Sequence, residues 1–122
     1  MTTQEVANRY YELAQQGQNE KIIDELYSPN IVSIEPKNAS DVPLKVEGTI
    51  EYKEKEKIFF QMVEQFHGGF CKEPSVATFH FSCVMGMDVT IKGKRKMKEE
   101  IGVFEVRNGK IVSEQFFYDD FY

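Results

Sequence analysis

The fold of this chain is decided by residues 75–118, which read SVATFHFSCVMGMDVTIKGKRKMKEEIGVFEVRNGKIVSEQFFY. The stretch divides into three apolar runs of alternating character, at residues 75–91, 96–106 and 110–118. Lys92-Gly93 and Asn108-Gly109 separate these runs, and Asn-Gly between alternating segments is a strong signal for a tight β-hairpin turn. The pattern therefore predicts three long antiparallel strands. Strands of this length twist and curl, so the concave face of the sheet requires a cover.

The first 29 residues predict two helices that could supply part of this cover. Thr2 and Glu5 form a capping-box pattern, in which each side chain satisfies a backbone N–H group of the other residue. We expect this helix to end at Gly17, because glycine readily adopts the left-handed conformation after a helix. Asn19 then caps a second, short helix, which ends before Ser28-Pro29.

A short strand, a loop and a long helix are predicted next. Residues 30–35 form the strand, and residues 36–47 form a loop because they are rich in Asn, Ser, Asp and Pro. The third helix begins at residues 48–49 and runs to about Phe66, with apolar residues repeating at intervals of three and four. Three helices on one face of a curled antiparallel sheet make an α+β architecture. The sequence thus predicts one cone-shaped α+β barrel domain over residues 1–122.

Composition excludes several classes of partner. The formal net charge of −5 argues against nucleic acid, because phosphate binding requires a basic surface. No apolar run approaches the roughly 20 residues of a membrane-spanning helix, and the N-terminus lacks the pattern of a secretory signal. Cys71 and Cys83 do not form a Cys-x-x-Cys motif. We therefore expect a cytoplasmic protein with reduced thiols, a disulfide between these two cysteines being the alternative.

Six short motifs, spread over nearly the whole chain, carry a resemblance to a known family: NRYYEL (8–13), LYSPN (26–30), IEP (34–36), VEG (46–48), NGKIV (108–112) and EQFFYD (114–119). With them the chain resembles the SnoaL-like proteins of the nuclear transport factor 2-like superfamily, which includes ketosteroid isomerases and polyketide cyclases. The resemblance implies a cone whose mostly apolar interior binds a small organic molecule without a cofactor. It implies no single activity, because this fold serves many functions.

Alternation along the strands, together with the resemblance, predicts which residues line the pocket. The larger apolar set of the first long strand should face inward. The resemblance, matched on Gly93 and Gly109, adds the inward positions of the next two strands. The predicted lining residues are Tyr27, Lys55, Phe59, Phe79, Phe81, Met85, Met87, Lys98, Gly102, Phe104, Glu114, Phe116 and Tyr118.

The opposite face of the same strands is also apolar. Met97, Ile101, Val103, Ile111 and Phe117 are expected to point outward. An exposed apolar patch of this kind indicates a partner, and we expect a homodimer through the outer face of the sheet.

Glu35 is the strongest candidate for a catalytic base. It ends an apolar strand and precedes Pro36, and in isomerases of the superfamily an Asp-Pro at the equivalent place provides the base. Apolar walls would raise the pKa of its carboxyl group and suit it to proton abstraction. The alternative is that Glu35 forms an ion pair with Lys55 at the mouth of the cone.

Two further residues are candidates for stabilising a substrate oxyanion. Tyr10 matches the tyrosine that donates to the oxyanion in the isomerases, although a tyrosine on the core stripe of a helix can simply pack. Gly102 departs from the family pattern, because the isomerases place a protonated aspartate there. Glu100, or Glu114 on the neighbouring strand, could supply that acid instead.

The histidines and the remaining motifs predict no metal or cofactor site. His67 and His80 are far apart in sequence and lack ligand spacing, and no phosphate loop or nucleotide fingerprint is present. The sequence therefore favours a small-molecule-binding domain, with acid–base isomerase, cyclase or hydratase chemistry on a carbonyl compound. A non-catalytic ligand-binding domain and a dimeric interaction module are the alternatives.

Overall fold

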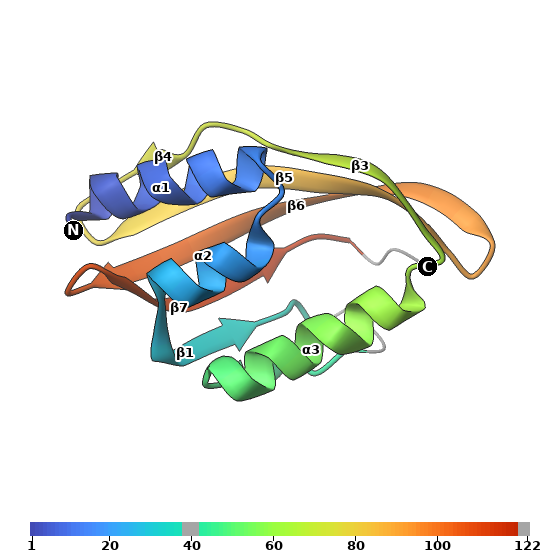
Figure 1. The fold of residues 1–122 in the computed structure, drawn as a ribbon, viewed down its shortest axis with the longest axis horizontal. Helices are drawn as coiled ribbons and strands as arrows, with labels where there is room; N and C mark the ends of the chain where they lie inside the picture. Colours follow the sequence, from blue (N-terminus) through green and yellow to red (C-terminus); the bar gives the residue numbers. More distant parts are fainter. Residues whose placement is uncertain (38–41, 120–122) are drawn as a thin grey trace.

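The computed structural model describes residues 1–37 and 42–119 and confirms the α+β cone. Three helices pack on one curved sheet (Figure 1). The elements are α1 (Thr3–Gln15), α2 (Asn19–Leu26), β1 (Tyr27–Ile34), β2 (Lys45–Glu47), α3 (Thr49–Met62), β3 (Gln65–Cys71), β4 (Ser75–Val76), β5 (His80–Ile91), β6 (Lys94–Arg107) and β7 (Lys110–Phe117). None of the described helices is both long and apolar enough to cross a membrane.

The sheet has the strand order β2-β1-β7-β6-β5-β3, with β4 paired to β5. Every pairing is antiparallel except that of β1 with β7, which is parallel. Strands from the two ends of the chain therefore lie side by side in the middle of the sheet (Figure 1). This pairing brings the end of β1, where Glu35 follows, next to β7.

The capping box predicted at the start of α1 is present. Thr2 Oγ1 accepts a hydrogen bond from the Glu5 amide at 3.1 Å, and Glu5 Oε1 accepts one from the Thr2 amide at 2.8 Å. Gly17 has a φ of 67° and ends this segment, as predicted. The helix buries one stripe against the sheet, with Val6, Ala7, Tyr10 and Leu13 in the core.

The boundaries of α2 differ from the prediction. The N-cap is Gln18, which makes no side-chain capping bond, and Asn19 is already helical. The helix ends at Leu26, and Ser28 and Pro29 lie inside β1 rather than in a stop signal. Tyr27, the first residue of β1, has extended dihedral angles and is buried, so the chain passes directly from helix to strand.

The prediction that the third helix reaches Phe66 was wrong. The helix ends at Met62, and β3 (Gln65–Cys71) begins three residues later and forms the edge of the sheet. Gly69 of β3 and Gly86 of β5 allow these two strands to lie close together. A Cβ atom on Gly69 would lie 2.9 Å from the Gly86 carbonyl oxygen, and one on Gly86 would lie 2.5 Å from the ring of Phe70. Phe70 and Gly86 are paired across the strands, so the aromatic ring covers the glycine.

Residues 75–91 form two strands instead of one. The chain turns tightly between β4 and β5, where the Ala77 amide donates to the His80 carbonyl oxygen at 2.7 Å. The loop predicted for residues 36–47 contains the short strand β2, whereas residues 38–41 lie outside the described part of the chain.

A β-bulge in β7 overturns one assignment of faces. Glu105 pairs with Ser113 whereas Val106 pairs with Ile111, so Val112 is an extra residue in the ladder. An extra residue reverses the alternation beyond it. As a result Ile111 and Glu114 both point inward and are 0% and 1% exposed, so Ile111 does not belong to the outer face.

Candidate functional site

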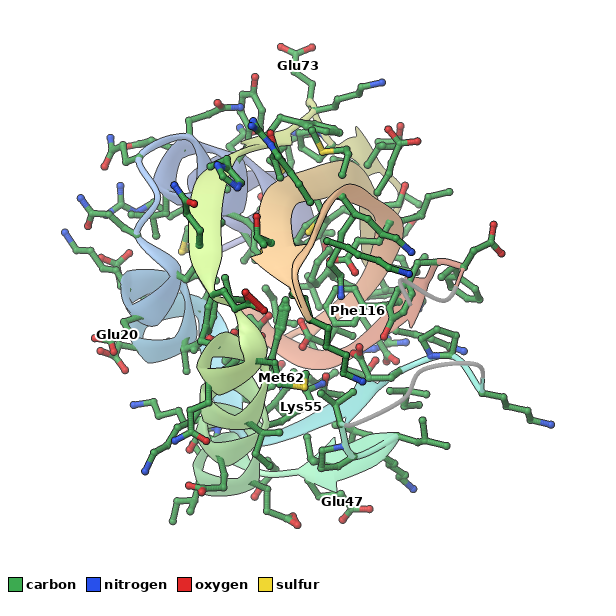
Figure 2. The ribbon with its side chains drawn as sticks, turned by 90° about the vertical axis from the view of Figure 1, so that its right-hand side faces the viewer. Glu20, Glu47, Lys55, Met62, Glu73 and Phe116 are labelled. Atoms are coloured by element: carbon green, nitrogen blue, oxygen red, sulfur yellow. The ribbon has the colours of Figure 1, made fainter. Side chains whose placement is uncertain are left out.

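A cavity of about 570 Å³ lies between the three helices and the concave face of the sheet. Figure 2 looks along the sheet into this space, with Lys55 and Phe116 inside it and Glu20, Glu47 and Glu73 pointing away. Most of the predicted site residues line the cavity: Tyr10, Tyr27, Glu35, Lys55, Phe59, Met85, Met87, Lys98, Glu100, Phe116 and Tyr118.

Five predicted lining residues lie elsewhere. Phe81 and Phe104 are stacked in the core with ring centroids 4.7 Å apart. Gly102 is covered by aromatic rings, and Glu114 is buried in the wall. Phe79 lies in the turn between β4 and β5, where it is 47% exposed and packs under the Arg107 guanidinium, 4.0 Å from its ring centroid. The turn removes Phe79 from the alternation of β5, which is why its predicted position was wrong.

Glu35 faces the cavity from the end of β1, and both of its carboxylate oxygens are engaged. Oε2 lies 3.2 Å from the Lys55 ammonium, and Oε1 accepts a hydrogen bond from the Tyr118 hydroxyl at 2.6 Å. The side chains of Lys55 and Glu35 are only 8% and 12% exposed. The ion pair with Lys55, which the sequence left as an alternative, is therefore present and largely shielded from solvent.

The Lys55 ammonium also connects the cavity with a buried polar network. It donates to Ser33 Oγ at 2.5 Å, and Ser33 donates to Glu114 Oε1 at 2.7 Å. Glu114 Oε2 in turn accepts a hydrogen bond from the Tyr27 hydroxyl. Ser33 was not predicted from the sequence, although Ile31, Ser33 and Glu35 share one face of β1 and the spacing of two is a usable signal.

Glu114 is 1% exposed, and burial raises the pKa of its carboxyl group to about 7. Lys55 and the hydrogen bonds from Tyr27 and Ser33 act in the opposite direction. The Tyr27 and Ser33 hydroxyl groups can donate hydrogen bonds to the Glu114 carboxylate, and a hydroxyl oxygen can also accept one from the protonated acid.

Glu100 projects into the cavity from β6, two residues beyond Lys98. Burial raises the pKa of Glu100 to about 8, and the negative charge of Glu35 adds to the rise, whereas Lys98 opposes it. At neutral pH Glu100 is therefore mainly an uncharged acid that can donate a proton. Glu35, in contrast, lies 3.2 Å from the Lys55 ammonium, so Glu35 and Glu100 stand in different electrostatic surroundings.

Lys98 and Tyr10 complete the polar part of the lining. The Lys98 ammonium lies 4.4 Å from the centroid of the Phe59 ring and 5.6 Å from that of Tyr118. The Tyr10 ring packs 4.7 Å from Phe104, centroid to centroid, and is 7% exposed. Burial raises the pKa of the Tyr10 hydroxyl well above its usual value, so this group stays a neutral donor.

The described residues contain no group of three or more His, Cys, Asp or Glu side chains placed to hold a metal ion. His67 Nε2 is within hydrogen-bond distance of Thr90 Oγ1, at 2.8 Å, and His80 lies 4.0 Å from Glu105. The polar side chains that line the cavity include carboxyl, ammonium, phenol, amide and thiol groups.

The sequence and the fold match a known family. The model of the SnoaL-like domain matches residues 1–118, and the chain belongs to the SnoaL-like family. The crystal structure of a SnoaL-like polyketide cyclase candidate from Mesorhizobium loti is 30% identical, with a TM-score of 0.86 over 97% of this chain and 100% of that one.

Two more distant solved structures share the fold. A protein of ketosteroid isomerase-like fold from Catenulispora acidiphila, in complex with trimethylamine, is 18% identical over 97% of this chain and 88% of that one, with a TM-score of 0.71. TerC, co-crystallised with polyporic acid, is 15% identical over 96% and 91%, with a TM-score of 0.75. No curated protein sequence matches this chain.

Proposed function

We propose that this protein binds a small organic carbonyl compound in the cavity and catalyses a cofactor-free proton transfer on it, of the isomerase, cyclase or hydratase type. The observation that carries the proposal is that two carboxyl groups in different surroundings, Glu35 and Glu100, line one largely apolar cavity. Glu35 lies beside the Lys55 ammonium, whereas the pKa of Glu100 is raised to about 8. A base and an acid that face the same volume can remove a proton from carbon while protonating the carbonyl oxygen. The ligand-bound relatives, one with trimethylamine and one with polyporic acid, support small-molecule binding by such cones.

In the proposed reaction Glu35 takes the proton from the carbon beside the carbonyl group. The electrons of the broken C–H bond form a C=C bond, and the carbonyl oxygen accepts a proton or a strong hydrogen bond from Glu100. The resulting enol returns its O–H proton to Glu100 while protonated Glu35 gives its proton to another carbon. In a cyclisation the nucleophilic carbon instead attacks a second carbonyl group, whose oxygen takes the proton from Glu35 as the enol O–H proton returns to Glu100. Lys55 and Tyr118 hold the Glu35 carboxylate in place through their contacts of 3.2 and 2.6 Å.

Glu100 takes the role that Gly102 cannot fill. A Cβ atom on Gly102 would lie 2.9 Å from the Phe104 ring and 3.2 Å from the Phe116 ring, so no acidic side chain fits there. Glu100 lies two residues earlier on the same strand, with its carboxyl group in the cavity. Tyr10 of α1 also lines the cavity and is the second candidate donor to the substrate oxygen.

Deuterium exchange tests this proposal. The exchange of α-protons of β-tetralone in heavy water should be faster with the protein than in buffer, and Glu35→Gln should abolish the acceleration. Glu100→Gln should reduce it by about 10²–10³, the usual cost of one good oxyanion donor. Glu99→Gln, on the exposed side of the same strand, is the matched control and should leave exchange unchanged. Exchange no faster than in buffer would leave the ligand-binding and interaction alternatives.

We also propose that the protein forms a homodimer through the outer face of the sheet and that it works in the cytoplasm. Met97, Ile101 and Phe117 are 55%, 45% and 49% exposed, and Ile101 pairs directly with Phe117 across β6 and β7. Apolar side chains that gather on one face favour a protein partner over solvent. Neither Cys71 nor Cys83 belongs to a Cys-x-x-Cys motif, as is usual in a reducing compartment.

A further inference from the structure

The ammonium group of Lys55 lies between two carboxyl groups, one in the cavity and one in its wall. On the cavity side it is 3.2 Å from Glu35 Oε2. On the other side it donates to Ser33 Oγ at 2.5 Å, and the Ser33 hydroxyl donates to Glu114 Oε1 at 2.7 Å. Ser33 and Glu114 are 0% and 1% exposed, so solvent screens these interactions only weakly.

The fold fixes the link between Lys55 and Glu114. Ser33 of β1 and Glu114 of β7 are register partners in the parallel pairing of these strands, and Lys55 reaches them from α3. A serine hydroxyl has one hydrogen and two lone pairs. Because Ser33 donates its hydrogen to Glu114, its lone pairs are available to the Lys55 ammonium. The position and the charge of Glu114 are therefore transmitted to Lys55 through a single hydroxyl group.

Lys55 is also the source of positive charge near Glu114. The titratable groups that act on Glu114, or on which it acts, within the described part of the chain are Tyr10 of α1, Tyr27 of β1, Tyr52, Lys55 and Glu56 of α3, and Glu100 of β6. Lys55 is the cation among them. Burial raises the pKa of Glu114 to about 7, and Lys55 opposes this rise more than the hydrogen bonds from Tyr27 and Ser33 do. The charge of Glu114 thus changes in the neutral range, close to the ammonium that contacts Glu35.

We propose that Glu114 is a positioning residue for the base Glu35: through Ser33 it holds the Lys55 ammonium in place, and its charge competes with that of Glu35 for the same ammonium. Glu114 is buried in the wall and acts only through Lys55. When Glu114 ionises, the ammonium is shared between two carboxylates and stabilises the Glu35 carboxylate less, which favours proton abstraction by Glu35. The positioning role rests on the proposed function, whereas the coupling of Glu114 to Lys55 does not.

The titration of Glu114 tests the coupling without any substrate. Carboxyl 13C NMR should show Glu114 titrating at about pH 7 in the wild-type protein, and Glu114→Gln identifies its signal. Lys55→Met removes the ammonium and should raise this midpoint by about one unit or more, the usual effect of a close opposite charge. Lys53→Met is the matched control, because Lys53 lies on the same helix, is 55% exposed and pairs with Asp24, so the midpoint should not change. Ser33→Ala removes the linking hydroxyl and should also raise the midpoint, which keeps the test decisive if Lys55→Met folds poorly.

The pH profile of deuterium exchange into β-tetralone tests the positioning role. In the wild-type protein exchange should rise by at least about threefold between pH 6 and 7.5, as Glu114 ionises. Glu114→Gln keeps an oxygen acceptor for Ser33 but cannot ionise, so it should remain active and lose this rise. Glu114→Leu removes the acceptor as well and should lower exchange by about tenfold or more at every pH. A purely structural role would reduce the stability of both variants but leave the rise in the profile of Glu114→Gln.

The two measurements distinguish failure of the inference from failure of the proposed function. A Glu114 midpoint that is the same in wild type, Lys55→Met and Ser33→Ala overturns the inference, whether or not the protein catalyses exchange. A shifted midpoint in a protein that exchanges no faster than buffer supports the coupling but overturns the proposed function, and the positioning role with it. A wild-type rise in exchange that persists in Glu114→Gln overturns the positioning role alone. A shifted midpoint, together with a rise that Glu114→Gln abolishes, supports the whole inference.

Discussion

At Gly102 the packing leaves no room for an acidic side chain. It pairs with Cys83 on one side and with Phe116 on the other, at the centre of the sheet. The ring of Phe104, which is 0% exposed, fills the space where a side chain of residue 102 would begin. In the proposed reaction the acid therefore comes from another position, and Glu100 is an acidic side chain of β6 that lines the cavity.

We predict that Gly102→Ala destabilises the protein by about 1–3 kcal/mol, the usual cost of inserting a methyl group into a packed core. The added Cβ would lie 2.9 and 3.0 Å from two atoms of the Phe104 ring and 3.2 Å from the Phe116 ring. Urea unfolding followed by circular dichroism measures the loss. The same substitution in a Phe116→Leu background should cost less, because a smaller neighbour leaves room. An equal cost in both backgrounds would show that crowding by Phe116 is not part of the cause.

At the scale of single residues, the sequence predicted which side chains line the site better than it predicted their hydrogen-bond partners. Glu35, Lys55 and Tyr10 were recognised because a strand end, a helix stripe and family motifs mark them. Ser33 was not recognised: its spacing of two from Glu35 puts it on the same face, but its bond to Glu114 is evident only from the structure. The partners of that bond, 81 residues apart, are brought together only by the parallel pairing of β1 with β7.

At the scale of elements, the turn residues predicted the hairpins of the sheet correctly, whereas the β-bulge in β7 was not predicted. The hairpins at Gly93 and Gly109 were predicted, and both glycines have positive φ angles of 74° and 75°. The extra residue at Val112 was not, because alternation alone cannot distinguish a regular strand from a bulged one. Likewise the helical spacing of residues 49–66 continued past the true end of α3, and only the pairing of β3 with β5 decides between helix and strand there.

The capping box of α1 gives a prediction at the same scale. Thr2→Ala removes the acceptor for the Glu5 amide and should lower the free energy of unfolding by about 1 kcal/mol. Gln4→Ala is a suitable control, since its side chain is exposed and its amide bonds only to Asn8 on the same helix. It should change stability by less than about 0.5 kcal/mol. A Thr2→Ala protein as stable as wild type in urea would show that the cap contributes nothing measurable.

At the scale of the whole molecule, two acids with raised pKa values, Glu100 and Glu114, predict an unusual dependence of stability on pH. The pKa values of Glu100 and Glu114 are raised to about 8 and about 7 in the folded state, so the folded protein binds more protons than the unfolded chain between about pH 4.5 and pH 8. Stability that these groups provide is complete below about pH 4.5 and is lost as the pH rises through 7 and 8.

We therefore expect the free energy of unfolding to fall from pH 5 to pH 8.5, by on the order of 6 kcal/mol. Glu25 and Asp88, whose pKa values are lowered by Arg9 and Arg95, act only in the more acidic range and with the opposite sign. Glu114→Gln and Glu100→Gln should each flatten the decline. Denaturant unfolding at a series of pH values is the measurement, and stability that rises between pH 5 and 8.5 would contradict the expectation.

The proposed dimer can be tested on the same molecule. Phe117→Glu places a charge in the centre of the outer face and should shift sedimentation toward the monomer without changing the helix content. Ile50→Glu introduces the same charge on α3 at a position that is 86% exposed, so it should leave the assembly unchanged. Wild-type protein that sediments as a monomer at high concentration would rule out the dimer.

The position of β7 between β1 and β6 also determines the order in which the molecule can be built. During synthesis the three helices and strands β1–β6 leave the ribosome before β7. Until β7 emerges, the edge of β1 that pairs with it has no partner strand. Non-local pairings of this kind are slow to form and expose strand edges in the meantime. The contact between Ser33 and Glu114, and with it the charged end of the cavity, can form only after β7 has emerged. A nascent chain of this protein thus completes its site late, in the same step that closes its sheet.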